Sequence, residues 1–473
     1  MNFKAFYLFA IFLALFLVPV KGRDYYATPM GAGDKNGTSW PDAIPGSGIE
    51  RFILNAMKPG DRLLLDDKGS FFDDLHITIF AGGKDEKSRI VIEGVKGQDG
   101  YPLIRGKYSY FEIEPGAKVA GVPHNQHHYP GSSPDPEFQE NNSYCFFLDT
   151  NVHYLTIKNL RIKQYDVALK MHADRNHVFL RNGIALEGLE IDSVYFGIYV
   201  ADLRRSTIKN CSISHYIKNA IRLEMGCKYV NIIDCFTDHD KGDLSFPEDW
   251  AIGFNVDKGR NNKKRSYYDS LDQQYITFRN CESRNNVARD NPVFWNGDGF
   301  LVNGRHQNIR FFDCTAYGNA DGGWDNKGKD VYFENCIAVH NGRNFRTWHS
   351  ATFKNCLAAN PAKYNKNSPS GGNDNFWLNG KYGLDAAIKL YNVTSHNGKI
   401  ESSDHMVKIK IAENCIFSAG CDASRVESGN NNIFTESPDE PGFFAPSFNF
   451  DGHPKDAYNS KKYGPEKGAW FTK

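Results

Sequence analysis

Short apolar runs recur along the chain at a common spacing, with polar turn residues between them. From Tyr154 onward, a short polar residue or Gly precedes an apolar residue or Cys at Asn159-Leu160, Gly188-Leu189, Asn210-Cys211, Asp234-Cys235, Asn280-Cys281, Asp313-Cys314, Asn335-Cys336, Asn355-Cys356, Asn392-Val393 and Asn414-Cys415. Uninterrupted repeats are about 20 to 24 residues long, which is a solenoid period. The repeats contain β-type runs such as TIKNLRI and no helical pattern. The sequence therefore predicts an all-β fold, a right-handed parallel β-helix with long loop insertions.

Six segments can be aligned in a second register, at 196–201, 219–224, 252–257, 298–303, 322–327 and 343–348. One inward column then contains Ile198, Ile221, Phe254, Phe300, Trp324 and Phe345. Successive residues of a strand point to opposite faces, so the residues between them face outward. The two outward columns are Tyr199, Arg222, Asn255, Leu301, Asp325 and Arg346, and beside them Ala201, Glu224, Asp257, Asn303, Lys327 and Trp348. We expect a polar strip that suits a polysaccharide, with Arg222, Asn255, Asp257, Trp295, Asn303 and Trp348 as binding residues.

Seven of the ten cysteines follow Asn or Asp in the same phase of the repeat. Equivalent positions of stacked coils point the same way, so we expect these side chains to be small buried apolar groups. Disulfides between neighbouring coils are the alternative, because coil spacing is within disulfide reach. The preceding Asn residues are expected to stack and to hydrogen-bond along the solenoid axis at a turn.

The chain begins with Met1-Asn2-Phe3-Lys4, followed by an uncharged run from Ala5 to Val20. Its shortness and position predict a secretory signal peptide at residues 1–22, with a retained anchor as the alternative. Cleavage would remove two of the 56 basic residues and none of the 56 acidic ones, leaving a formal net charge of −2. That balance gives no reason to expect nucleic acid or a membrane as partner. We expect a secreted or periplasmic monomer.

Residues 23–473 are expected to form one β-helix domain. Residues 23–60 would be an N-terminal cap with a short helix at Ile49–Met57, and residues 436–473 an irregular tail. A Pro- and His-rich loop is expected at 113–143. Insertions at 239–273 and 283–297 are expected to form walls of a groove, with solvated loops as the alternative, because long loops on a rigid scaffold carry function.

Three acidic residues interrupt the repeat on adjacent coils. Asp298 begins one strand, Asp321 directly precedes the next, and Asp325 lies within that next strand. Calcium takes several carboxylate oxygens and tolerates irregular geometry, so the three could share an ion. In the alternative, these residues cap turns of an Asn- and Asp-rich protein.

The segments NGDGFLVN and NADGGWD resemble the signature of polysaccharide lyase family nine, a group of pectate lyase-like β-helix proteins. The resemblance covers about residues 180 to 360. It implies that Asp298, Asp321 and Asp325 bind Ca²⁺, with Gly322 where the family has a further acid. It also places Arg346 where the family's catalytic base is a Lys.

The resemblance implies a lyase that removes the C5 proton of a uronate and expels the oxygen at C4. Such an enzyme must neutralise the sugar carboxylate and place a base near C5. Arg346 is the first candidate for the base, Lys327 the second and His349 the third. Arg346 is favoured because it lies one coil beyond Asp325 in the same outward column.

The expected function is therefore calcium-assisted cleavage of a pectate-like acidic polysaccharide by β-elimination. A β-helical glycoside hydrolase with two carboxylates remains an alternative. A non-catalytic carbohydrate-binding or adhesion solenoid is the other alternative.

Overall fold

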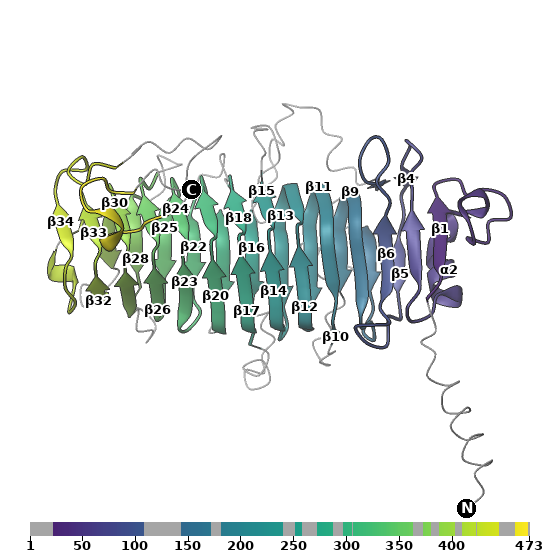
Figure 1. Ribbon diagram of the computed structural model, residues 1–473, viewed down its shortest axis with the longest axis horizontal. Coiled ribbons are helices and arrows are strands. Elements are labelled where there is room, and N and C mark those ends of the chain that lie inside the picture. Colours follow the sequence, from purple (N-terminus) through teal and green to yellow (C-terminus); the bar gives the residue numbers. More distant parts are fainter. Residues whose placement is uncertain are drawn as a thin grey trace, which may run out of the picture.

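The computed structural model describes residues 22–107, 143–171, 181–239, 251–257, 272–286, 297–304, 306–362, 372–379, 387–402, 409–421, 423–443 and 459–471. It is an elongated stack of parallel strands, with β1 near one end of the stack and β34 at the other (Figure 1). A coil such as that of β20, β21 and β22 contributes three strands, and each of them pairs with its equivalent in the next coil. The prediction of a right-handed parallel β-helix is confirmed. No helix in these ranges is long and apolar enough to span a membrane.

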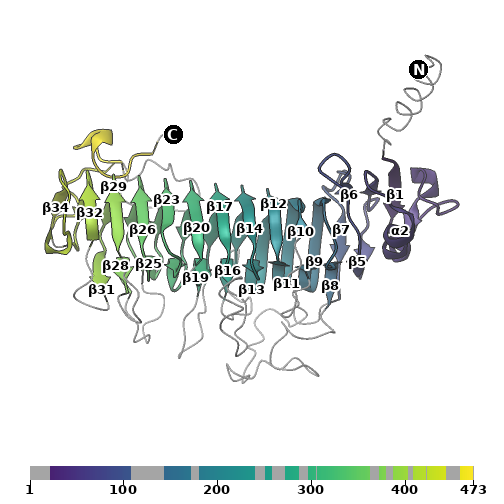
Figure 2. The same cartoon turned by 90° about the horizontal axis from the view of Figure 1, so that it is seen from below.

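The stack has three sheets, of which the first and third lie on opposite sides (Figure 2). The first contains β1 (Asp24–Thr28), β3 (Arg62–Leu65), β6 (Ile90–Gly94), β12 (Leu203–Lys209), β14 (Lys228–Ile233), β17 (Gln274–Arg279), β20 (Gln307–Phe312), β23 (Val331–Glu334), β26 (Ala351–Lys354), β29 (Ile388–Tyr391) and β32 (Ile409–Glu413). The second contains β4 (Phe72–Asp73), β7 (Leu103–Arg105), β15 (Phe236–Asp238), β18 (Glu282–Arg284), β21 (Thr315–Tyr317), β24 (Ile337–Val339), β27 (Leu357–Ala359), β30 (Thr394–His396), β33 (Ile416–Ser418) and β34 (Ile433–Thr435).

The third sheet carries the polar strip expected from the sequence. It contains β5 (Ile77–Ile79), β8 (Tyr144–Leu148), β16 (Ile252–Asp257), β19 (Asp298–Asn303), β22 (Gly322–Asn326), β25 (Arg343–Thr347), β28 (Asp374–Leu378) and β31 (Lys399–Ser402). Three long strands turn the corners between sheets: β9 (Leu155–Met171), β11 (Ala185–Ala201) and β13 (Ser212–Glu224). The short strands β2 (Ile44–Pro45) and β10 (Arg181–Asn182) pair with β1 and β12.

The residue before each Cys of the repeat adopts a left-handed backbone conformation. Asn210, Asn280 and Asn335 have φ between 50° and 56°. Asn, Asp and Gly tolerate this region best, which explains why the repeat has them there. The side chains also bond along the axis, as Asn335 Nδ2 does to Asp313 Oδ1 at 3.0 Å, so the expected ladder is present.

The cysteines of the repeat are buried free thiols. Burial raises the pKa of Cys415 to about 12, so this thiol stays protonated at neutral pH. The structure thus contains the buried apolar groups expected from the sequence and not the alternative disulfides.

The helix expected near the N-terminus is α2 (Ile49–Ala56), which buries Ile49 and Ile53 at the end of the stack. Toward the other end, Phe443, Ala469 and Phe471 pack against apolar side chains of β24, β27 and β33 in the second sheet. Packing at both places covers apolar surface that a bare solenoid would expose.

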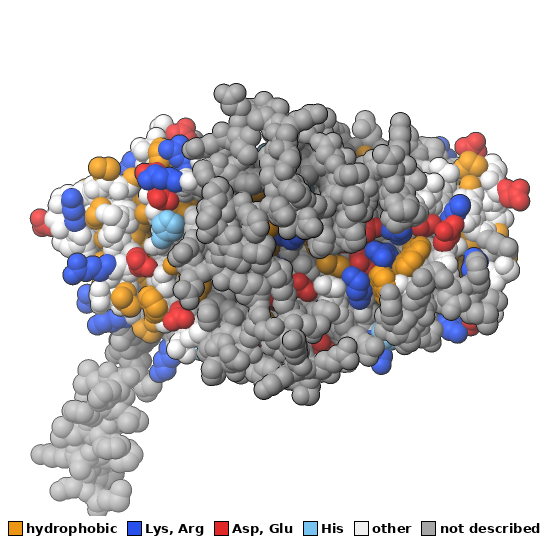
Figure 3. Space-filling view, turned by 180° about the vertical axis from the view of Figure 1, so that it is seen from behind, with side chains coloured by type: hydrophobic (Ala, Val, Ile, Leu, Met, Phe, Trp, Pro, Cys, Tyr) orange, Lys and Arg blue, Asp and Glu red, His pale blue; other side chains and the backbone are white. Residues whose placement is uncertain are grey.

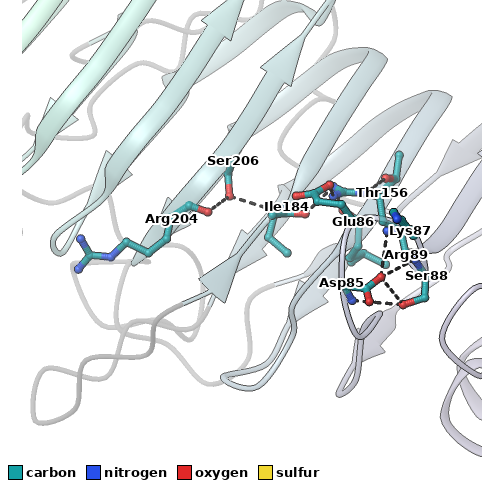
Figure 4. Close-up of polar contacts among 11 residues, drawn as sticks. Asp85, Glu86, Lys87, Ser88, Arg89, Thr156, Ile184, Arg204 and Ser206 are labelled. Carbon is teal, nitrogen blue, oxygen red and sulfur yellow. Dashed lines mark hydrogen bonds and ion pairs between the residues drawn. The ribbon is translucent and has the colours of Figure 1, made fainter.

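Arg89 connects neighbouring coils near the N-terminal end by hydrogen bonds (Figure 4). Its Nε donates to Thr156 Oγ1 at 2.9 Å, and its guanidinium also bonds Glu86 and the carbonyl oxygen of Gly183. One side chain therefore links the turn before β6 to β9 and to the next coil. Such lateral ties fix the register of coils that have only local contacts.

Candidate active site

The pairing register places the outward columns as the sequence predicted. Arg222 pairs with Asn255, Asn255 with Leu301, Leu301 with Asp325, and Asp325 with Arg346. Figure 3 looks onto this face of the third sheet. Toward its C-terminal end, on the right, basic, acidic and hydrophobic side chains lie together in a band.

A ladder of stacked aromatic rings supports these strands from inside. Phe254, Phe300, Trp324, Phe345 and Phe376 occupy successive coils, with ring centroids 4.7 to 5.3 Å apart and planes within 18° of parallel. The spacing equals the separation of paired strands, so each ring fills the space above its neighbour. The backbone beneath the site is therefore held by rigid packing.

A buried ladder of amides lies at the corner where the second sheet turns into the third. Asn286 donates to Asn319 at 2.7 Å, Asn319 to Asn341 at 2.8 Å, Asn341 to Asn344 at 2.9 Å and Asn344 to Asn375 at 2.8 Å. These amides are fully buried. They fix the chain immediately beside Asp321, Arg343 and Asp374, so the charged side chains start from a defined backbone.

Asp298 is the most deeply buried of the three acids singled out from the sequence. It has no exposed surface, and its Oδ1 accepts the backbone N–H of Gly322 at 2.8 Å. Its Oδ2 has no hydrogen-bond partner. Burial raises the pKa of Asp298 well above its usual range, and the nearby Asp321 and Asp325 raise it further.

Asp321 lies between two arginines. Arg343 NH1 bonds its Oδ1, and Arg346 NH1 donates to its Oδ2 at 3.2 Å. Arg343 also lies 3.5 Å from Asp374 Oδ2, one coil further along the axis. Both oxygens of Asp321 are thus occupied by guanidinium groups.

Asp325 has a different set of donors. Trp348 Nε1 donates to its Oδ1 at 2.6 Å, Lys327 Nζ lies 2.9 Å from its Oδ2, and Arg346 NH1 lies 3.7 Å away. Although burial opposes ionisation, Lys327 and Arg346 lower the pKa of Asp325, which is therefore an anion. It holds three groups of the site in place at once.

Arg346 also lies between two tryptophans. Its guanidinium carbon is 4.7 Å from the ring of Trp348 and 4.9 Å from that of Trp377, and its side chain is 18% exposed. The carboxylates of Asp325, Asp321 and Asp298 raise the pKa of Arg346 against the effect of burial. The expectation that Arg346 is the base stays a prediction, although three acids favour its charged form and a guanidinium gives up its proton only at very high pH.

The remaining predicted binding residues connect this cluster to earlier coils. Arg222 NH2 pairs with Glu224 at 2.7 Å and with Asp257 at 2.9 Å, and Asn303 Nδ2 donates to Asp257 at 3.0 Å. Lys327 then donates to Asn303 Oδ1 at 3.3 Å. A continuous chain of polar contacts therefore runs along the axis from β13 to β28.

Asn255 and His349, two further residues singled out from the sequence, form hydrogen bonds within the chain. Asn255 is buried and donates to Asn219 at 2.9 Å, so its side chain supports the strip and its amide nitrogen is not free for substrate. His349 Nδ1 accepts the N–H of Ser350 at 3.0 Å. Trp295, the loop at 113–143 except its last residue, and most of the proposed groove walls lie outside the described residues.

Three members of the cluster were not expected from the sequence: Arg343, Asp374 and Trp377. Arg343 and Asp374 are two residues before Phe345 and Phe376, so strand alternation assigned that position to the interior. At the corner, Asn344 and Asn375 fill the interior instead. Trp377 pairs with Arg346, which extension of the outward column by one coil would have revealed.

The calcium ion implied by the resemblance stays a prediction, and the residues present do not fit it in this arrangement. Each oxygen of Asp321 and Asp325 has a basic or N–H partner, which leaves only Asp298 Oδ2. In the described part of the chain, no three His, Cys, Asp or Glu side chains are arranged to hold a metal.

No family model and no curated protein matches this chain. Similar solved structures include pectate lyase Pel9A, at 14% identity over 96% of this chain and 90% of that chain with a TM-score of 0.39. A rhamnogalacturonan lyase is 14% identical over 94% and 96%, with a TM-score of 0.40. The structure of XylC with xylose is 11% identical over 91% and 88%, with a TM-score of 0.47. At these values the likeness concerns the fold alone.

Proposed function

We propose that this chain cleaves a uronate-containing polysaccharide by β-elimination at the cluster around Asp325. The observation that carries the proposal is Arg346, a partly exposed guanidinium held by two carboxylates between two indole rings. A planar guanidinium binds a carboxylate through two parallel hydrogen bonds, and aromatic faces pack against sugar rings. Arg346 is therefore assigned as the clamp for the uronate carboxylate, with Trp348 and Trp377 as the platform for the sugars.

Lys327 is assigned as the base that takes the C5 proton. Its side chain is 30% exposed, against 18% for Arg346 and 8% for Arg343, and an amine, unlike a guanidinium, can accept a proton. Asp325 fixes both Lys327 and Arg346, so the base and the clamp have a defined separation. The geometry thus supplies the two groups that the elimination needs.

In the proposed reaction Arg346 neutralises the uronate carboxylate, which favours the enolate-like transition state. Lys327 first gives its ammonium proton to solvent, and the neutral amine then removes the proton at C5 as the bond from C4 to the glycosidic oxygen breaks. A double bond forms between C4 and C5, and the leaving oxygen takes up a proton from water.

A product assay tests the proposal. The protein is incubated with polygalacturonate, alginate and rhamnogalacturonan, and both near-ultraviolet absorbance and reducing ends are measured. Elimination raises both signals together, because each cut creates one unsaturated uronate. Reducing ends without absorbance would instead indicate a glycoside hydrolase, and binding with neither signal a carbohydrate-binding solenoid.

A further inference from the structure

We infer that Arg343 acts as an internal cation of the acidic cluster, in the place that a divalent ion would otherwise take. It is a positioning residue, because it acts through Asp321 on Arg346 and not on the substrate. The inference rests on the proposed function, because it concerns the same cluster of charged residues. Its consequences for metal binding can be measured without an activity assay.

The first argument comes from the carboxylate oxygens. Arg343 and Arg346 each take one oxygen of Asp321, and Arg343 also faces Asp374. The side chains of Arg343, Asp321 and Asp374 are 8%, 7% and 3% exposed. Buried carboxylates need a compensating cation, and here a side chain of the same chain provides it.

The second argument comes from the column that contains Arg343. Gly322 pairs with Arg343, and Arg343 with Asp374. A Cβ atom on Gly322 would lie 2.7 Å from Asp298 Oδ1, so no further acid fits at this position without displacing Asp298. The next side chain along the column is Arg343, which brings positive charge to the acids from the following coil.

The third argument is that Arg343 is held from several sides. The neighbouring Asn344 donates to Asn375 Oδ1 at 2.8 Å and to the Ala359 carbonyl at 2.9 Å, which fixes the backbone. The guanidinium carbon lies 5.6 Å from the ring of Trp377. A calcium ion that bound Asp321 would have to displace a cation that packing, backbone and charge all keep in place.

Removal of the Arg343 guanidinium should show that it takes the place of a metal ion. Without Arg343, the buried carboxylates of Asp321 and Asp374 lose the cation between them, and only Asp321 keeps a partner in Arg346. Carboxylate oxygens are what a hard divalent cation binds. The Arg343→Met variant keeps the alkyl packing and loses the charge. It should therefore acquire calcium binding that the wild-type protein does not have.

Thermal unfolding in EDTA and in millimolar CaCl₂ tests the inference. Wild type and Arg343→Lys are expected to have the same Tm in both buffers. Arg343→Met is expected to have a lower Tm in EDTA and to regain about 3 °C or more in CaCl₂. Arg284→Met is the matched control, because Arg284 pairs with Asp238 at 2.8 Å on the second sheet, and its Tm should not respond to calcium.

Two results would overturn the inference. One is a wild-type Tm that falls in EDTA and recovers in CaCl₂, since the ion would then be resident. The other is an Arg343→Met chain that calcium does not stabilise or that folds in neither buffer, since an ion would then be unable to replace the guanidinium. Neither result depends on a substrate, so failure of the proposed elimination would be seen separately in the product assay.

Discussion

Two arginines lie in the same outward column, four coils apart, and have different surroundings. Arg222 is 5% exposed, is paired with Glu224 and Asp257, and packs on the ring of Tyr199. Arg346 also contacts two acids and aromatic rings, but its side chain is 18% exposed and lies beside a lysine. A buried ion pair, such as that of Arg222, contributes to the packing of the coil. A partly exposed ion pair beside a lysine, such as that of Arg346, can also bind a substrate and take part in its reaction.

Among the substitutions that compare the Arg346 region with the Arg222 region, substitution of Lys327 should have the largest effect on activity. Lys327→Ala should lower kcat by about 10²- to 10⁴-fold with little change in KM, because it removes the base. Lys327→Arg should lose as much activity, because the charge is kept and the proton acceptor is lost. Steady-state kinetics on the cleaved polymer measure both.

The control for this test is Lys354→Ala. Lys354 pairs with Glu334 at 3.0 Å on the first sheet, away from the strip, and its removal should leave kcat unchanged. A Lys327→Ala enzyme with normal kcat and a raised KM would show that Lys327 is a binding residue.

Removal of each arginine should separate binding from stability. Arg346→Ala should raise KM by about 10- to 100-fold, because one charge-assisted contact to substrate is lost. Arg222→Ala should lower the free energy of unfolding by about 3–5 kcal/mol, because two buried acids lose their partner, with KM of the folded enzyme unchanged. Denaturant unfolding and kinetics are measured on both variants, and equal effects on KM would end the distinction between the two regions.

The acid next to Arg343 should give the cluster a pH-dependent stability. Burial and the neighbouring Glu401 raise the pKa of Asp374 to about 6, although Arg343 and Lys399 oppose them. Between about pH 4 and pH 6 the folded state thus binds more protons than the unfolded state, so stability falls as pH rises through this window. The loss should be about 1–3 kcal/mol, with no further loss from this group above pH 6.

Asp374→Asn should remove this slope and leave the rest of the stability curve as it is. The free energy of unfolding is measured by urea titration from pH 4 to pH 8. A wild-type curve without a decline between pH 4 and pH 6, or an unchanged slope in Asp374→Asn, would show that Asp374 is not the group responsible.

The aromatic platform should contribute the smallest effect. Trp377→Ala should raise KM by roughly 3- to 10-fold with kcat nearly constant, because a stacking contact of about 1 kcal/mol is lost. Trp377→Phe should be milder, since a smaller ring remains. Substitution of Tyr199, which packs on Arg222, should not change KM, and a change as large as that of Trp377→Ala would mean that both regions touch the substrate.

The sequence determined the coil architecture because its causes are local. A left-handed turn residue before each Cys, and inward apolar positions between polar ones, repeat with the coil and therefore fix register and columns. For that reason the columns through Asp325 and Arg346 could be assigned from the residues alone.

The tertiary structure decided which of these residues act together. Charge compensation depends on side-chain positions that the inward and outward alternation along a strand does not predict. At the corner of the coil Asn344 turns inward, so Arg343 comes to lie against Asp321 and Asp374. The contacts of Arg346 with two acids and two indole rings join residues from three coils. Proton affinity depends on such neighbours and on burial, and the acids around Arg346, which favour its charged form, come together only in the folded chain.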